Sequence, residues 1–202
     1  FIGGELVSSD GVVRKEDDYL LMTNEYIVDH STSKWSRLSR QSLAAGALAR
    51  LNNNFALLHP QAREVAAGFS LQPVNHNPFM NNVAQLVECV HVVIDSIAII
   101  NELLAGTWQE PRQPVVAKEG RGVGAVEVPR GILYHAYEFD PFGRITKADC
   151  VIPTSQNNAN IHYDIIELAR QAAAQEIPDN EIRRLAEMLV RAYDPCISCS
   201  VH

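Results

Sequence analysis

The longest hydrophobic pattern in this 202-residue chain runs from Pro78 to Leu104 and constrains the fold more than any other feature. Asn77 can cap a helix here, and proline suits the first helical position. Apolar residues then recur at helical spacing, and Gly106 is a stop signal. They are Phe79, Val83, Leu86, Val87, Val90, Val93, Ile94, Ile97 and Leu104. A helix of this length and apolarity is expected to pack inside an α-rich protein.

The sequence after this helix changes character and predicts an antiparallel β element. Residues Gly122 to Val128 alternate small and branched side chains, and Ile132 to Phe139 has the composition of a strand. Asp140 to Gly143, with proline second and glycine fourth, is a good turn. The residues from Arg144 to Ile152 are therefore expected to return as the next strand.

Helices are expected on both sides of this β element. Ser42 to Leu58 indicates a short helix or an irregular packed stretch, and helices are predicted from about Asn158 to Ala174 and from Asp179 to about Ala192. Leu20–Met22 and Tyr26–Val28 are interpreted as short strands or buried edges. The predicted fold class is mainly α with a small antiparallel β element, an α+β protein with long packed helices.

The composition is that of an ordinary globular protein, with 47% hydrophobic and 20% charged residues, and we expect residues 1–202 to form a single domain. The net charge of −7 argues against nucleic acid as a partner, because phosphate binding needs a basic face. Polar residues interrupt Val83 to Leu104, so no membrane span is expected. Acidic residues soon after Phe1 exclude a signal peptide, and a start without methionine is expected of a fragment or a processed chain.

The four cysteines are a poor disulfide framework for a chain of this size and favour a metal or redox pair in a cytoplasmic protein. Cys89 falls within the long apolar helix and is expected to be a core residue, and Cys150 also stands alone. Cys196 and Cys199 are separated by two residues, so both sulfurs can bind one metal ion. Soft thiolates select zinc, nickel, copper or iron–sulfur clusters, and two thiolates are half of a four-coordinate site.

The spacing of this pair leaves several kinds of site open. A zinc site would need two more ligands, which lone histidines elsewhere in the chain could supply. A c-type haem would need a histidine directly after Cys199, but Ser200 stands there. A thioredoxin-like redox pair begins a helix, whereas this pair follows one. Two tail cysteines without a function are the simplest alternative.

The tail from Asp194 to His202 reads Asp-Pro-Cys-x-x-Cys-x-x-His and resembles the C-terminal nickel-binding motif of [NiFe]-hydrogenase large subunits. In that family the precursor is cut after this histidine, or an arginine, once nickel is inserted. A chain that stops at His202 is therefore expected to be the mature form. The resemblance is closest to the cytoplasmic branch that couples hydrogen to NAD(P), to the deazaflavin F420 or to a disulfide-reducing partner.

Three further segments resemble the same family and keep its order along the chain. Glu127–Gly131 resembles the segment whose arginine overhangs the metal site, and Ile152–Asn157 resembles the segment whose hydroxyl faces a cyanide ligand of the iron. Gly46–Asn52 matches a third stretch, with Ala47 in place of the family's proline. The family's first nickel motif, Arg-x-Cys-Gly-x-x-Cys, has no match here. The sequence therefore predicts the C-terminal portion of a large subunit, with half of the nickel site.

The resemblance implies reversible heterolytic cleavage of dihydrogen at a nickel–iron centre whose iron carries carbonyl and cyanide ligands. Cys196 would be a terminal nickel ligand and a candidate proton acceptor, and Cys199 would bridge nickel and iron. His202 would bind a magnesium ion through its imidazole, with the backbone carbonyl of Cys150 as a further ligand. Magnesium prefers oxygen ligands, so the imidazole is an unusual feature of this assignment.

The resemblance also implies a polar surround for the metals, because buried anionic ligands need donors. Arg130, always charged and with a planar fork of donors, would pair with Asp194 above the metal. Without such a role, Arg130 would be a surface arginine after a turn, and Asp194 would be a carboxylate at the end of a helix. The Thr154 hydroxyl is expected to face a cyanide, and its alternative is a helix cap. The residues expected around the metal ligands are Pro129, Ile152, Pro153 and Thr154.

The chain shows neither a Rossmann glycine-rich loop nor the cysteine spacing of an iron–sulfur protein. Electrons are therefore expected to pass to a small iron–sulfur subunit and then to diaphorase, F420-reducing or heterodisulfide-reductase-type subunits. Another chain or fragment would supply the first Cys-x-x-Cys motif. The alternative from a different class is a non-catalytic zinc-binding or assembly module that uses the tail cysteines. A respiratory-complex relative that has lost the metal is disfavoured, since it would not need both of these cysteines.

Overall fold

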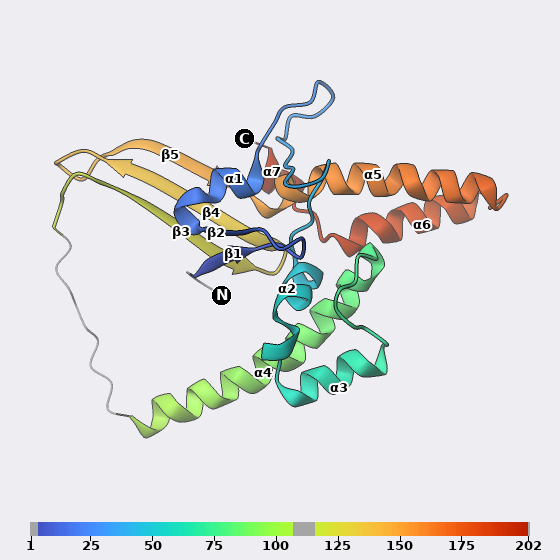
Figure 1. Cartoon of the computed structure of the whole chain (residues 1–202), viewed down its shortest axis with the longest axis horizontal. Coiled ribbons are helices and arrows are strands. Elements are labelled where there is room, and N and C mark those ends of the chain that lie inside the picture. The colour runs from blue at the N-terminus through green and yellow to red at the C-terminus, as the bar shows by residue number, and fades with distance from the viewer. Residues whose placement is uncertain (1–3, 107–115, 202) are drawn as a thin grey trace.

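The computed structural model describes residues 4–106 and 116–201, and contains a three-stranded sheet and two groups of helices (Figure 1). The helices are α1 Tyr19–Thr23, α2 Ala47–Asn54, α3 Pro60–Gly68, α4 Asn81–Ala105, α5 Pro153–Ala174, α6 Asp179–Ala192 and α7 Ile197–Ser200, and the strands are β1 Glu5–Val7, β2 Val13–Lys15, β3 Gly120–Val128, β4 Gly131–Phe139 and β5 Ile145–Val151. This is the mainly α fold with a small antiparallel β element that the sequence predicts.

The β3–β4–β5 sheet is antiparallel throughout, and its two connections are tight. Val128 pairs with Gly131 across the first turn, so Pro129 and Arg130 form its tip. The second turn closes through a hydrogen bond from the Gly143 amide to the Asp140 carbonyl, at 2.9 Å. The predicted strands and the predicted turn at Asp140 are confirmed. Alternate side chains of the sheet, among them Ala125, Tyr134 and Ala136, are buried in a core shared with Leu6, Tyr19 and Met22.

The α5–α6 pair leaves the sheet as a helical hairpin (Figure 1). The limits of α6 agree with the prediction, but α5 begins at Pro153, five residues earlier than expected. Proline fits this first turn because its missing amide hydrogen has no helical acceptor there. The earlier start places Thr154 inside the helix, and it does not cap α5 with its side chain. The interpretation of Thr154 as a helix cap is therefore wrong.

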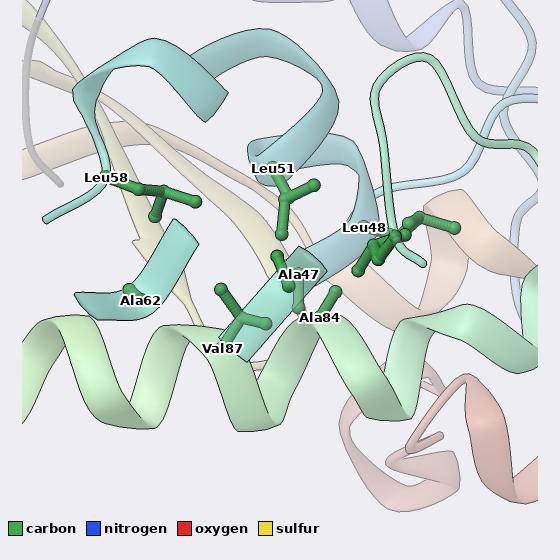
Figure 2. Close-up of a cluster of buried hydrophobic side chains, with 9 residues drawn as sticks. Ala47, Leu48, Leu51, Leu58, Ala62, Ala84 and Val87 are labelled. Atoms are coloured by element: carbon green, nitrogen blue, oxygen red, sulfur yellow. The ribbon is translucent and has the colours of Figure 1, made fainter. Parts of the chain in front are cut away.

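The second core lies where α2 and α3 pack on the N-terminal half of α4 (Figure 2). Leu51, Ala62 and Val87 are buried at its centre. The Asn77 side chain accepts a hydrogen bond from the Phe79 amide at 3.1 Å and caps the 3-10 turn that leads into α4, as the sequence predicts. This core fixes α2, which carries the Gly46–Asn52 segment, against the long helix.

The remainder of α4 corrects three predictions. Its C-terminal half extends away from the other helices (Figure 1), and side chains such as Ile97 and Leu104 are exposed. The long helix is therefore not packed inside the described chain, and Cys89 is exposed and not in the core. By length and composition, the 28-residue segment Pro78–Ala105 could cross a membrane, which overturns the expectation that none could. Glu88, Asp95 and Glu102 interrupt the segment, but the apolar residues between them keep it apolar on average.

The N-terminal region also differs in detail from the prediction. Leu20 to Met22 lies in the short helix α1 and does not form a strand. Tyr26 makes an isolated antiparallel bridge to Trp35 and is not part of a sheet. The β1–β2 hairpin and α3 were not foreseen. Strands of three residues and a nine-residue helix carry too little periodic pattern to be recognised.

Candidate metal centre

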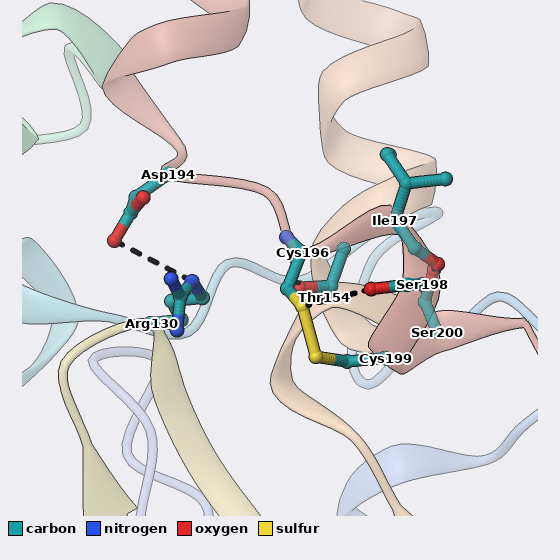
Figure 3. Close-up of a disulfide and its surroundings, with 8 residues drawn as sticks. All are labelled: Arg130, Thr154, Asp194, Cys196, Ile197, Ser198, Cys199 and Ser200. Carbon is teal, nitrogen blue, oxygen red and sulfur yellow. Dashed lines mark hydrogen bonds and ion pairs between the residues drawn. A yellow bond between two sulfur atoms is a disulfide. The ribbon is translucent and has the colours of Figure 1, made fainter.

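The chain turns sharply between α6 and the two tail cysteines. Asp194 adopts a left-handed backbone with φ of 46° directly before Pro195, and α6 has ended at Ala192. Cys196 precedes the four-residue helix α7, which carries Cys199. The two Cα atoms are 5.3 Å apart, and the sulfurs are joined as a disulfide (Figure 3). The tail therefore brings both sulfurs to one place, as the spacing predicts.

The disulfide itself was not predicted, since the sequence was interpreted as a thiolate pair. Thiolates, and not disulfides, bind metals, so this bond must be reduced before the pair can hold nickel or iron. Cys196 lies directly before the short helix α7. The expectation that this pair would not lie at the start of a helix, which counted against a redox pair, is therefore wrong. Among the residues that the structure describes, no group of three or more Cys, His, Asp or Glu side chains could hold a metal ion.

Helix α5 positions the first tail cysteine through Thr154. The Thr154 hydroxyl oxygen accepts a hydrogen bond from the Cys196 amide at 3.1 Å. Thr154 is buried, and so are the next three residues, Ser155, Gln156 and Asn157, each no more than 3% exposed. A threonine hydroxyl that accepts one hydrogen bond still has its own proton to donate. Thr154 therefore lies against the cysteine pair with a donor available, in the first turn of α5.

Arg130 and Asp194 meet across the β3–β4 turn and the end of α6. The Arg130 Nε lies 3.5 Å from Asp194 Oδ2, and both side chains are partly exposed (Figure 3). Because Asp194 is two residues before Cys196, this ion pair lies beside the tail cysteines. The left-handed backbone of Asp194 and the following proline aim its carboxylate at the arginine.

The backbone of the Arg130 turn is closely packed. Gly131 has φ of +138°, and a side-chain Cβ there would lie 2.7 Å from Ala45 Cβ, so glycine is required. Asn157 donates to the carbonyls of Ala45 (3.1 Å) and Arg130 (3.4 Å), and accepts from the Ala45 amide (2.8 Å). Asn157 therefore joins the turn, α5 and the segment before α2 through one buried side chain.

A sequence profile described as nickel-dependent hydrogenase matches residues 29–202. The chain belongs to this family. It is 38% identical over 202 residues to sulfhydrogenase 1 subunit alpha of Pyrococcus furiosus, covering 99% of this chain and 46% of that protein. It is 32% identical over 208 residues to the NAD-reducing hydrogenase HoxS subunit beta of Cupriavidus necator, covering 95% and 42%.

Solved hydrogenases share the fold. The crystal structure of an NAD+-reducing [NiFe]-hydrogenase in the H2-reduced state matches all of this chain and 50% of its own, with a TM-score of 0.74 and 25% identity. A reduced, active Ni-Fe-Se hydrogenase from Desulfomicrobium baculatum matches 86% of this chain with a TM-score of 0.61 at 19% identity, which shows the fold alone. This member of the nickel-dependent hydrogenases therefore spans half or less of the relatives that it matches.

The donors present fit half of the metal centre of such a hydrogenase. Once the disulfide is reduced, two soft thiolates lie near a hydroxyl donor and a guanidinium, and this set of donors suits a soft metal such as nickel. The remaining ligands would have to come from outside the described residues. Pro129 shapes the Arg130 turn, and Ile152 leads β5 into Pro153 and α5.

The structure describes only one of the two residues of the predicted magnesium site. His202 lies outside the described residues. Cys150 is near the end of β5, paired with His135 of β4 in the sheet register. Its thiol lies 3.3 Å from His135 Nδ1 and 3.8 Å from the Tyr137 hydroxyl. The side chain therefore has its own polar neighbours, and the expected role of Cys150 concerns its carbonyl alone.

Arg50 and Asn157 of the family segments and Asn81 of α4 have no predicted role, but the structure places all three at the centre of the hydrogen bonding. Asn157 is described above, and Arg50 of α2 contacts the Arg130 turn. Asn81 accepts from the Leu48 amide at 2.9 Å and donates to the Ala192 carbonyl at 2.6 Å, which ties α2 and α4 to the end of α6. Arg50 and Asn157 lie in stretches that resemble the family, but a sequence does not show which backbone groups such side chains reach.

Proposed function

We propose that this chain is the catalytic-subunit portion of a nickel–iron hydrogenase that reversibly oxidises dihydrogen to protons and electrons. One observation carries the proposal: the two tail sulfurs lie together, with the Thr154 hydroxyl and the Arg130–Asp194 ion pair beside them. A structural disulfide at the end of a chain would need no such surround of hydroxyl, guanidinium and carboxylate.

The chain's own residues have distinct tasks in this proposal. A nickel–iron centre with carbonyl and cyanide ligands, when bound, supplies the heterolytic cleavage of dihydrogen. Cys196 and Cys199, once reduced to thiolates, would hold the metals, Cys196 as a nickel ligand and Cys199 as a ligand of both nickel and iron. Cys196 would also be the proton acceptor, because a thiolate sulfur is both a ligand and a base. Its place at the edge of α7, beside a partly exposed ion pair, lets the proton leave toward solvent.

The surrounding donors would stabilise anionic ligands on the iron. Thr154 would use its remaining proton for this purpose, and Arg130 would contribute a planar fork of N–H donors. Asp194 orients the guanidinium and balances its charge. The backbone of Pro129 and the Ile152–Pro153 step hold these donors in place. A magnesium ion bound by the His202 imidazole and the Cys150 carbonyl would fix the tail.

The partners follow from the half-site and from the relatives. A second chain or segment carries the other Cys-x-x-Cys motif, and a small iron–sulfur subunit with clusters takes the electrons. The resemblance to the cytoplasmic branch implies NAD(P), F420 or a heterodisulfide-reductase-type subunit as the final acceptor. One relative is described as NAD-reducing, which supports NAD(P), and another is described as F420-non-reducing. With acceptors of this kind, the enzyme is expected in the cytoplasm.

Infrared spectroscopy combined with metal analysis of the assembled enzyme tests this function. Nickel, together with carbonyl and cyanide stretching bands from iron ligands, is expected in a matured sample purified with its partners, and iron exceeds nickel because the partner's iron–sulfur clusters contribute to it. Zinc without nickel or these bands would contradict the proposal and indicate a zinc-binding module. Nickel and iron without the bands would refute the iron ligands.

A further inference from the structure

Arg50 of α2 is largely buried between α4 and the end of β3, although arginine is ordinarily a surface residue. Its side chain is 10% exposed. Its Nε and Nη2 contact the two carboxylate oxygens of Glu88 at 2.6 and 2.8 Å, and Nη1 contacts Glu127 at 2.7 Å. All three guanidinium nitrogens are therefore held in one fixed plane by carboxylates on two different elements.

The same guanidinium also contacts the backbone that leads to Arg130. Nη1 donates to the Val128 carbonyl at 2.8 Å, and Nη2 donates to the Pro129 carbonyl at 3.1 Å. These two carbonyls directly precede Arg130. A lysine ammonium could not reach these acceptors together, because it is a compact charge without a planar fork. Arg50 therefore joins the long helix α4 to the tip of the β3–β4 turn.

The charges in this cluster keep Arg50 ionised. Burial disfavours the charged guanidinium, but hydrogen bonds and the charges of Glu88 and Glu127 outweigh burial and raise the pKa of Arg50. Burial also raises the pKa of Glu127, and Arg50 offsets only part of this effect. Two carboxylates around one buried cation hold it strongly, which is the arrangement expected of a fixed anchor and not of a mobile surface side chain.

We propose that Arg50 is a positioning residue for hydrogen turnover: it fixes the Val128–Pro129 backbone so that the Arg130 guanidinium stays beside Asp194 and the tail cysteines. This inference rests on the proposed function, because it assigns the turn a task at the metal centre. Arg50 acts through the backbone of the turn and does not itself reach the tail cysteines.

The test is Arg50→Lys in the enzyme assembled with its partner subunits, with Arg184→Lys as the matched control. Arg184 makes the same two-pronged contact with Glu181, at 2.6 and 2.8 Å, but on the exposed surface of α6. Arg50→Lys is expected to keep nickel and iron while hydrogen turnover falls about 10- to 100-fold, because small misplacements of a catalytic group have effects of this size. The cyanide stretching bands are expected to shift, and Arg184→Lys is expected to change neither.

Unchanged turnover and unchanged cyanide bands in Arg50→Lys would overturn the inference. If Arg50→Lys does not retain metal, Glu127→Gln decides, because it keeps Arg50 but removes one of the two charges that hold its guanidinium against the Val128 and Pro129 carbonyls. Glu127→Gln is expected to retain metal, to lower turnover by a few fold and to shift the bands. Turnover and cyanide bands in Glu127→Gln that equal those of the unmodified enzyme would overturn the inference.

Amide hydrogen exchange separates this inference from the proposed function, because it needs no metal. Peptides that cover residues 128–132 are expected to exchange faster in Arg50→Lys than in Arg184→Lys, with the rest of the chain unchanged. If the unmodified enzyme lacks nickel and iron, the proposed function fails while this comparison still tests the anchor. Equal exchange in the two variants would remove the anchoring role alone.

Discussion

Two regions of this chain reverse the usual distribution of polar and apolar residues. The polar shell, Thr154 to Asn157, is almost completely buried, with no residue more than 3% exposed. The α4 face, which comprises Leu86, Val93, Ile97, Ile100 and Leu104, is apolar and 47% to 80% exposed. The chain thus satisfies the polar groups near its tail cysteines internally, but the described residues leave the α4 face uncovered. Buried polar groups require hydrogen-bond partners, whereas an exposed apolar face requires only another apolar surface packed against it.

The largest expected effect separates the cysteines of these two regions. Cys199→Ser should abolish nickel binding and hydrogen uptake in the assembled enzyme, because a neutral hydroxyl is a poor ligand for nickel. Cys89→Ser, on the exposed side of α4, should leave both unchanged. Metal analysis and a hydrogen-uptake assay measure the difference. Full uptake in Cys199→Ser would show that the tail is not the metal site.

The next effect concerns the charge beside the polar shell. Arg130→Lys should lower turnover by about 100-fold or more while nickel and iron content stays near normal, because a single point charge replaces a fork of donors. Steady-state uptake and metal analysis of the same sample test this expectation. Normal turnover would count against a role for the Arg130–Asp194 pair.

A smaller effect compares stability in the two regions. Asn157→Leu should lower the free energy of unfolding by about 3 kcal/mol, because the Ala45 amide and two carbonyls lose a buried partner. Ile97→Ser on the α4 face should change it by less than about 0.5 kcal/mol in the chain alone. Urea unfolding gives both values. Equal losses would mean that the two regions do not differ as described.

The smallest effect is a pH dependence next to the polar shell. Because burial raises the pKa of Glu127, the folded state holds its proton more tightly than the unfolded state. The contribution of Glu127 to stability is therefore fully present below its ordinary pKa of 4.5 and is lost as the pH rises through the higher folded value. Between these two pKa values, the free energy of unfolding measured with urea should fall as the pH rises. The fall should be smaller in Glu127→Gln. An identical slope in the variant would assign the pH dependence to other groups.

Much of the fold could be predicted because long periodic segments dominate it. The α4, α6 and β3–β5 segments carry strong patterns, and the Asp140 turn has the expected proline and glycine. The short elements β1, β2 and α3 do not. The exposure of α4 could not be foreseen, because hydrophobic periodicity shows that a face needs covering but not whether this chain covers it.

The candidate site could be predicted as residue types and order, but not as contacts. The family segments identify Cys196, Cys199, Arg130 and Thr154. They do not show that the Thr154 hydroxyl accepts a hydrogen bond from the Cys196 amide, or that Arg50 reaches the Pro129 carbonyl from 79 residues away in sequence. Such contacts depend on tertiary packing, and a single sequence contains no direct record of it.

Nickel X-ray absorption spectroscopy of the assembled, reduced enzyme tests the central claim most directly. The account predicts nickel bound to sulfur ligands from two Cys-x-x-Cys pairs, one of them Cys196 and Cys199, with nickel lost in the Cys196→Ser/Cys199→Ser double variant. Nickel retained in that variant with the same number of sulfur ligands would contradict the claim that this chain carries half of the site.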